Sequence, residues 1–306
     1  MDATADYRHF RSATDDDNIV WLTFDKADTG TNVFSPEVLE ELDSILQVIA
    51  AQPPRGLVIL SGKPNGFIAG ADIKSFTDVR NEKDAMVFLQ RGQDVLNRLA
   101  DCPFPTVALI HGFCLGGGTE MSLACRYRVM RDDPGTRIGL PEVRLGIHPG
   151  WGGSARMVPL IGAIKAMDLI LSGRSIDGRT AKRFGLIDHV APERHLREAA
   201  RRLVLEQPDP HRPGFIDRLS NNALLRPLLG RVFRKQVGKR ASRRHYPAPY
   251  AIIDIWQRLT GNTSRMLQAE AESLASLITG ATARNLIRVF FLMERLKSLG
   301  KDSSWR

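Results

Sequence analysis

The first half of the chain alternates short apolar runs with segments whose apolar residues recur at helical spacing. Polar and apolar positions alternate in one strand-like segment, two others are continuous apolar runs, and two longer segments have helical periodicity. We therefore predict strands at 18–25, 56–61 and 105–110 and helices at 36–51 and 84–100. Strands that alternate with helices over short links are typical of a layered α/β domain.

After Val190 the pattern becomes almost wholly helical. Proline- and glycine-rich stretches at 207–214, 246–249 and 260–263 predict breaks between the helices. We place a domain boundary near Glu206, which divides the chain into residues 1–206 and 207–306. The last predicted helix, 282–299, has a wide apolar face that must pack on something.

Composition is that of a globular protein, with 43% apolar and 25% charged residues among 306. No apolar run is long enough to span a bilayer, and the acidic start of the chain, residues 1–6, does not resemble a signal peptide. Cys102, Cys114 and Cys125 are odd in number and lack metal-ligand spacing. We predict a cytoplasmic protein with reduced thiols and no metal site.

The net charge of +9 is unevenly distributed, because residues 231–244 contain seven Lys and Arg and no acid. A solvated helix face is the favoured interpretation of this basic run. Contact with nucleic acid, a lipid surface or a phosphorylated ligand is the alternative. Phe233 is the one aromatic residue of the run, so stacking on several bases is not indicated.

The richest candidate chemistry follows the strand at 105–110. The glycines of 111–118 indicate a turn, and a helix is predicted from Thr119 to Tyr127. Free N–H groups at a helix start favour negative charge, and Glu120 lies beside them. Alone, this glutamate is ordinary compensation of the helix dipole. A second glutamate, Glu142, follows 22 positions later, after Pro141.

Three motifs together resemble the enoyl-CoA hydratase/isomerase (crotonase) family. They are Phe-Ile-Ala-Gly-Ala-Asp-Ile at 67–73, Gly-Gly-Gly-Thr-Glu at 116–120 and Leu-Pro-Glu-Val-Arg-Leu-Gly-Ile-His-Pro-Gly-Trp-Gly-Gly at 140–153. The resemblance extends from about Ile19 to Val190. It implies an α/β fold with a crotonase-like repeated ββα spiral core, followed by a mostly helical C-terminal region. The implied activity is hydration of trans-2-enoyl-CoA to 3-hydroxyacyl-CoA in fatty-acid β-oxidation.

The resemblance assigns a role to each of five site residues. The N–H groups of Ala71 and Gly117 are the oxyanion donors. Glu120 orients and deprotonates the water, Glu142 delivers a proton to C2, and the N–H of Gly150 helps to place the water. In chemical terms, charge develops on the thioester oxygen during the reaction, so fixed N–H donors are the main electrostatic need. The two carboxyl groups then divide the acid and base roles.

Acyl-CoA is the implied substrate, and no separate cofactor is required. By resemblance, the CoA lies along Phe67, Ile68, Ala69, Asp72 and Ile73. Three lysines are candidate phosphate partners, although a solvated surface charge is the more common role for each: Lys26, Lys63 and Lys74.

Three further residues near these motifs are interpreted as structural. Trp151 stands where many family members have a small residue, and we interpret it as core rather than as a narrowing of the acyl pocket. Structural roles are also preferred for His111 and His148, since the carboxylates already supply the acid and base.

Two other functions remain open. The same pair of glutamates permits migration of a double bond from the 3- to the 2-position, as in a 3,2-enoyl-CoA isomerase. A non-catalytic docking module is the third class, and the presence of both glutamates argues against it.

The helical tail adds a second resemblance. Residues 245–249, 270–272 and 282–292 resemble the linker region of the multifunctional fatty-acid oxidation proteins. There a 3-hydroxyacyl-CoA dehydrogenase domain follows, and only with that domain would NAD be a cofactor. No Gly-x-Gly-x-x-Gly turn follows 301–306, so we expect a truncated or detached hydratase part. A thiolase subunit or further copies of the chain, as in a trimer, are the expected partners.

Overall fold

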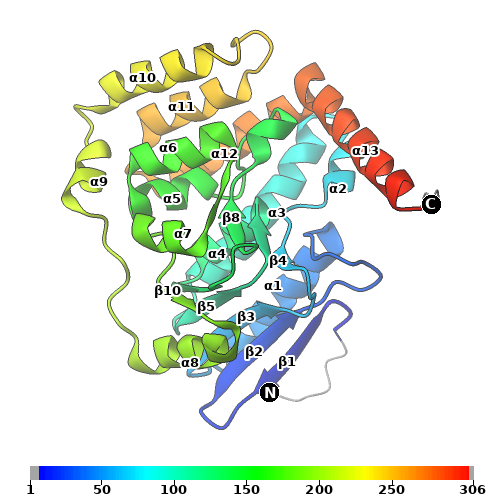
Figure 1. Ribbon diagram of the computed structural model, residues 1–306, viewed down its shortest axis with the longest axis vertical. Coiled ribbons are helices and arrows are strands. Elements are labelled where there is room, and N and C mark those ends of the chain that lie inside the picture. Colours follow the sequence, from blue (N-terminus) through cyan, green and yellow to red (C-terminus); the bar gives the residue numbers. More distant parts are fainter. Residues whose placement is uncertain (1–6, 303–306) are drawn as a thin grey trace.

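Two β-sheets form the centre of the molecule, and the larger has six strands in the order β1-β2-β3-β5-β7-β10 (Figure 1). The computed structural model describes residues 7–302. The strands of this sheet are β1 (Phe10–Thr14), β2 (Ile19–Phe24), β3 (Gly56–Ser61), β5 (Thr106–Ile110), β7 (Tyr127–Arg131) and β10 (His189–Ala191). β1 is antiparallel to β2, and all other neighbours are parallel. Parallel strands joined through helices confirm the predicted α/β class.

The smaller sheet has four strands in the order β4-β6-β8-β9. They are β4 (Gly66–Ile68), β6 (Phe113–Leu115), β8 (Arg137–Gly139) and β9 (Ser175–Asp177). The prediction that 111–118 is only a turn was therefore wrong, because β6 pairs with both β4 and β8. Strands of three residues are too short for alternation to reveal them.

One ββα pattern occurs three times along the chain. A strand of the larger sheet leads to a strand of the smaller sheet and then to a helix: β3 and β4 precede α2 (Ile73–Thr77), β5 and β6 precede α4 (Gly117–Ala124), and β7 and β8 precede the 3₁₀ helix η1 (Glu142–Leu145). This repetition is the predicted spiral core. It brings the segments that follow β4, β6 and β8 to one edge of the smaller sheet.

Two long helices cover the sheets, α1 (Pro36–Ala51) and α3 (Glu82–Ala100). α1 has the predicted bounds, and the Ser35 hydroxyl accepts a hydrogen bond from the Val38 N–H. α3 begins two residues earlier than predicted because the side chain of Asn81 caps its first N–H groups. Both helices bury their apolar stripes in the main core.

The helix predicted from Thr119 to Tyr127 was wrong at both ends. α4 begins at Gly117 and ends at Ala124, and Tyr127 is the first residue of β7. Cys125 already has extended backbone angles, and β7 pairs in parallel with β5 along its buried residues. Pairing with a buried strand outweighs the local helical pattern here.

The second half of the chain is mostly helical, as predicted. It contains α5 (Gly153–Ile161), α6 (Ala163–Ser172), α7 (Gly178–Phe184), η2 (Glu193–His195), α8 (Leu196–Glu206), α9 (Phe215–Ser220), α10 (Arg226–Gly238), α11 (Ala248–Leu259), α12 (Thr263–Thr279) and α13 (Ala281–Asp302). α8 packs on one face of the larger sheet, and α12 packs against α3 and α11. The boundary near Glu206 stays a prediction, although Trp256 and Leu274 share one core with the first half.

The last helix leaves part of its apolar face exposed. Ala283 and Ile287 are buried, whereas Leu292, Met293 and Leu296 are more than half exposed. α13 extends away from the rest of the molecule at the right of Figure 1. A partner on this face stays a prediction. The predictions for residues 1–6 and 303–306 lie outside the described residues.

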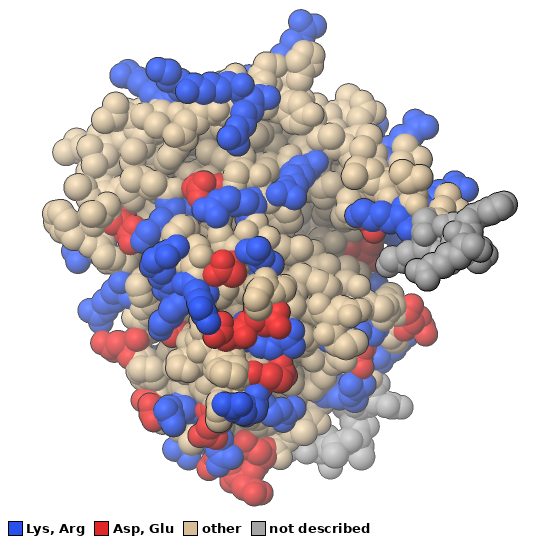
Figure 2. All heavy atoms as spheres, viewed as in Figure 1, with Lys and Arg blue, Asp and Glu red and all other residues tan. Residues whose placement is uncertain are grey.

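The basic run 231–244 covers the end of α10 and the loop after it. Arg234 and Arg243 pair with Asp254 of α11 at 2.6 and 3.1 Å, and most of the other basic side chains are exposed. Figure 2 shows Lys and Arg side chains along the upper edge of the molecule, over α10. Within residues 7–302, no helix is both long and apolar enough to cross a bilayer.

The three cysteines are free thiols. Cys114 and Cys125 are buried, and burial raises the pKa of each thiol to about 12. Cys102 is half-buried, and desolvation raises its pKa to about 11. Protonated thiols of this kind are poor nucleophiles and inert packing groups.

Candidate active site

The glycine turn before α4 sets the position of Glu120. Gly116 has φ 54° and ψ −125°, a backbone conformation that L side chains rarely adopt. The Thr119 hydroxyl lies 2.8 Å from the Gly139 carbonyl oxygen and ties the start of α4 to β8. All residues of α4 are buried, so Glu120 is held in the interior with 3% of its surface exposed.

The carboxyl group of Glu120 is bound by the loop that precedes α5. The N–H groups of Trp151 and Gly153 donate hydrogen bonds to Glu120 Oε1 at 2.7 and 2.9 Å. Arg156 lies close enough to favour the ionised form of Glu120, and its guanidinium donates to the Trp151 carbonyl at 2.7 Å. Glu120 is therefore a buried carboxylate with fixed donors on one oxygen.

Glu142 reaches the same place from η1. Its Oε1 lies 3.2 Å from the position that a Cβ on Gly116 would occupy, one helical turn before Glu120. Its Oε2 is buried and has no hydrogen-bond partner among the described residues. Buried carboxyl oxygens are rarely left unpaired, so this atom is a candidate to meet a ligand. The structure thus brings together two glutamates 22 positions apart.

Two backbone N–H groups converge beside these carboxyls. Gly117 is the first residue of α4, where N–H groups have no acceptor within the helix. Gly70, with φ 121°, turns the chain before Ala71. A Cβ built on Gly117 would lie 3.3 Å from the Ala71 nitrogen, so the two residues are neighbours. Within residues 7–302 neither N–H donates a hydrogen bond outside regular helix and strand pairing.

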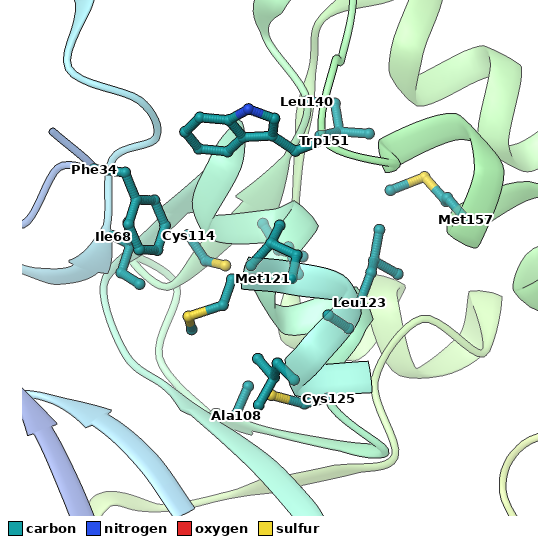
Figure 3. Close-up of a cluster of buried hydrophobic side chains, with 14 of the residues drawn as sticks. Phe34, Ile68, Ala108, Cys114, Met121, Leu123, Cys125, Leu140, Trp151 and Met157 are labelled. Atoms are coloured by element: carbon teal, nitrogen blue, oxygen red, sulfur yellow. The ribbon is translucent and has the colours of Figure 1, made fainter. Parts of the chain in front are cut away.

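The Trp151 side chain packs against the backbone at Gly117. The indole is 2% exposed and packs with Phe34 and Phe88, with ring centroids 5.8 and 5.4 Å apart. Figure 3 shows it beside Phe34 and over the start of α4. A Cβ on Gly117 would meet Trp151 Cζ3 at 2.7 Å. Trp151 is therefore a core residue, and it also lies directly against the Gly117 backbone.

A second fully enclosed glutamate, Glu270 of α12, was not predicted as a site residue. It is fully buried, and its carboxyl accepts hydrogen bonds from the N–H groups of Gly152 and Ala155, both at 2.9 Å, and from the Ser154 hydroxyl. A sequence signal existed, because residue 270 falls on the apolar stripe of its helix. Buried neighbours on that stripe are Met266, Leu267, Ala271, Leu274, Ala275 and Ile278.

Burial dominates the electrostatics of the three glutamates. Desolvation raises the pKa of Glu120 to about 7. The N–H donors and the positive charge of Arg156 favour the ionised carboxylate and lower this pKa, but their effect is smaller than that of desolvation. The pKa of Glu142 is raised well above its usual range, first by burial and then by the charge of Glu120. Burial raises the pKa of Glu270 to about 8. Glu120 and Glu142 therefore titrate as a pair, with Glu120 the easier to ionise.

These raised pKa values predict that the folded protein loses stability between pH 6.5 and 8.5. In the unfolded chain the carboxyls are fully ionised there, whereas the folded protein still holds protons on them, so raising the pH favours unfolding. His148, whose pKa burial lowers to about 4, acts in the opposite direction only below pH 6.5. We expect the melting temperature to fall by roughly 5–10 °C across this range.

Thermal unfolding followed by circular dichroism at several pH values measures this effect. Glu270→Gln removes one of the titrating groups and should flatten the decline. Glu272→Gln changes an exposed residue of the same helix and should keep the wild-type slope. A melting temperature that rises between pH 6.5 and 8.5 would contradict the assignment.

The other predicted site residues occupy different environments. The Gly150 carbonyl accepts a hydrogen bond from Gln93 of α3 at 2.7 Å, and its N–H helps to lower the pKa of Glu120. Its role in placing a water stays a prediction. His111 and His148 each bond a backbone carbonyl at 2.8 Å, in keeping with structural roles.

The predicted CoA segment is partly buried. Phe67 and Ile68 are fully buried members of the core, whereas Ala69, Asp72 and Ile73 are partly exposed. Asp72 caps α2 by accepting the Lys74 N–H at 3.1 Å. The CoA contacts stay predictions, and the partly exposed residues are the ones whose side chains a ligand can reach.

The three candidate lysines also differ. Lys26 and Lys63 are mostly buried and pair with Asp72 and Asp25 at 3.5 and 2.7 Å. Lys74 is exposed on α2. A phosphate could therefore bind Lys74 directly, whereas binding Lys26 or Lys63 would compete with an existing ion pair.

A cleft of about 600 Å³ lies between α13 and the end of α2. Its lining combines apolar side chains with guanidinium groups: Phe76, Thr77, Val79, Ile278, Arg284, Ile287, Arg288, Phe291, Leu292 and Arg295. The Phe76 ring packs edge-on against Phe88 at 5.9 Å, and Phe88 packs on Trp151. A line of aromatic rings therefore runs from the glutamates to the cleft.

Comparison with known proteins gives a family match over most of the chain. The family model described as "Enoyl-CoA hydratase/isomerase" matches residues 14–210. A fatty acid oxidation complex subunit alpha from Aliivibrio fischeri is 39% identical over 299 residues, which is 96% of this chain and 43% of that protein. The subunit of the same name from Shewanella putrefaciens is 36% identical over 288 residues, or 92% and 41%. The chain thus spans less than half the length of these curated relatives.

Solved structures give the same fold. An enoyl-CoA hydratase from Bacillus anthracis is 26% identical with a TM-score of 0.60, covering 85% of this chain and 95% of that chain. An enoyl-CoA hydratase from Bacillus halodurans has a TM-score of 0.68 at 18% identity, covering 92% and 99%. The second similarity concerns the fold alone. Together with the ββα repetition, these structures confirm the predicted spiral core.

Proposed function

The chain belongs to the enoyl-CoA hydratase/isomerase family, and we propose that it adds water across the 2,3 double bond of a trans-2-enoyl-CoA to give a 3-hydroxyacyl-CoA. The observation that carries the proposal is the unequal environment of two buried carboxyls. Glu120 accepts two N–H bonds, whereas Oε2 of Glu142 has no partner among the described residues. Such a pair separates into a base and an acid.

The pKa values support this division of roles. Glu120, with a pKa of about 7, is substantially ionised at neutral pH and takes a proton from water as the oxygen bonds to C3. Glu142, whose pKa is raised by burial and by the charge of Glu120, keeps its proton and delivers it to C2. Glu120 gains one proton and Glu142 loses one, so the step balances. Proton exchange between the two carboxyls or with solvent then returns Glu120 to its ionised form and Glu142 to its protonated form.

The thioester oxygen becomes negative as the water adds. We place that oxygen between the N–H groups of Ala71 and Gly117, which are neighbours at the start of α4. Donors fixed in a buried position need no reorganisation as the charge appears, which is why they favour the transition state. The Gly117 N–H also gains from the positive end of the α4 dipole.

The remainder of the substrate has an apolar acyl chain at one end and the negatively charged phosphates of CoA at the other, and each end needs a different environment. An acyl chain would follow the rings of Trp151 and Phe88 to the apolar walls of the cleft beside α13. Phosphates of CoA would meet an exposed cation outside that cleft, and Lys74 on α2 is the candidate. We further propose a role in fatty-acid β-oxidation, which is supported by the name of the relatives, fatty acid oxidation complex subunit alpha.

The direct test is turnover of 2-enoyl-CoA substrates from C4 to C16, followed by loss of the conjugated-thioester absorbance and by chromatography of the 3-hydroxy product. We expect hydration of crotonyl-CoA and of longer chains. Supplying 3-enoyl-CoA instead tests the isomerase. An isomerase would form 2-enoyl-CoA from it and leave added 2-enoyl-CoA unhydrated. Absence of both reactions would leave the non-catalytic docking module.

A further inference from the structure

Two carboxylates from different parts of the chain share the turn that opens α5. The N–H groups of Trp151 and Gly153 donate to Glu120, whereas those of Gly152 and Ala155 donate to Glu270. The donors therefore alternate between the two acceptors along five residues. Each carboxylate holds N–H groups that the start of a helix leaves without an internal acceptor.

Burial of the Glu270 carboxyl is unfavourable in free energy unless particular hydrogen bonds compensate for the lost hydration. A carboxyl with no exposed surface pays a desolvation penalty unless its oxygens are well bonded. Glu270 meets that condition through the turn alone, including the Ser154 hydroxyl. Gly152 has φ 98°, a conformation that glycine adopts readily and other residues rarely do, so a glycine is needed at this point of the turn.

We propose that Glu270 is a positioning residue for the hydration reaction. By binding Gly152 and Ala155, it holds the turn so that the intervening N–H groups of Trp151 and Gly153 point at the Glu120 carboxylate. The helical region after residue 206 would then complete the site without touching the reacting atoms. This inference rests on the proposed function, because Glu120 is the base of that reaction.

The charged groups that face Glu270 come from three elements. Glu120 belongs to α4, Glu142 to η1, and Arg156 to α5, and each interacts electrostatically with it. α3 contributes the neutral amide of Gln93, which bonds the Leu267 carbonyl of α12 at 2.7 Å. Among the described residues, no titratable group of α11 or α13 acts strongly on Glu270.

The neutral His148 also lies nearby, with its ring bonded to Ser273 of α12 at 2.8 Å. Because burial raises the pKa of Glu270 to about 8, its charge is largely absent between pH 6 and 7.5. Removing the side chain therefore changes mainly the geometry of the turn in that range. A change in the pH profile there reports on the N–H bonds to Glu120.

The experiment compares Glu270→Ala and Glu270→Asp with the wild type, using crotonyl-CoA. Alanine removes both acceptor oxygens, and aspartate is one methylene too short to reach both N–H groups. We expect kcat to fall about 10²-fold for alanine and less for aspartate, with little change in KM. The acid limb of the kcat profile should move to higher pH, because Glu120 loses bonds that favour its ionised form.

Glu272→Ala is the matched control, since Glu272 lies exposed on the same helix and accepts only the Gln268 amide at 2.8 Å. It should retain wild-type kinetics. Folded Glu270 variants with wild-type kcat and pH profile, even if less stable, would overturn the positioning role. Should alanine prevent folding, the aspartate variant decides by the same readouts. A wild type without turnover would overturn the proposed function and this inference together.

Discussion

Glu142→Gln is expected to lower the kcat for hydration of crotonyl-CoA by about 10³-fold while leaving the fold intact. Glutamine has the size of glutamic acid and fits the same partly buried position, but its amide cannot give up a proton to C2. Because the pKa of Glu142 is raised well above its usual range, the native side chain is neutral before reaction, so the substitution hardly changes the charge. The loss would therefore report proton transfer itself.

Glu120→Gln should be similarly inactive for a different reason. The amide oxygen can still accept the N–H bonds of Trp151 and Gly153, but it cannot remove a proton from water. In the double variant the loss should be far smaller than the product of the two single losses, because the two carboxyls act in one proton circuit.

The measurements are steady-state kinetics and circular dichroism on each variant, with Glu272→Gln as the exposed control. If either single variant retained activity near that of the wild type, the acid–base assignment would fail. If Glu142→Gln retained isomerisation but not hydration, the two reactions would not share their proton donor.

The features that the sequence predicted are those that depend on residues close together along the chain. β2, β3, β5 and α1 were predicted within a residue or so because their apolar periodicity lies within a single element. Glu120 was found because it directly follows a glycine turn next to a buried strand. Its meeting with Glu142 could only be taken from a resemblance, since it depends on the neighbouring strands β6 and β8.

Interactions between distant segments were missed for the same reason. The four-stranded sheet consists of strands of three residues, whose pairing is decided by partners far along the chain. β7 was not predicted as a strand, and the helix predicted from Thr119 extended into its first residue, Tyr127; pairing with β5 makes this segment a strand. Glu270 is separated from Ala155 by 115 residues. A glutamate on an apolar stripe was the available signal, and it indicates burial without naming the partner.

The second large effect is expected at Gly117, where an alanine should lower kcat by at least about 10²-fold. The added methyl would lie 3.3 Å from the Ala71 nitrogen, in the space where we place the thioester oxygen, and 2.7 Å from Trp151 Cζ3. Because the oxygen gains its charge only in the transition state, the loss should appear in kcat more than in KM. Gly30→Ala, which has no atom within 4 Å of the added Cβ, is the control.

A second variant separates the two contacts of that methyl. Trp151→Leu replaces the indole beside Gly117 with a smaller side chain. It should relieve the clash between the added methyl and the indole, but it leaves the methyl beside the Ala71 N–H. If the oxygen binds between the two N–H groups, Gly117→Ala combined with Trp151→Leu should remain far below Trp151→Leu alone. Recovery to the level of Trp151→Leu would mean that the methyl acts only by displacing the indole. The oxyanion would then have to be stabilised somewhere other than at Ala71 and Gly117.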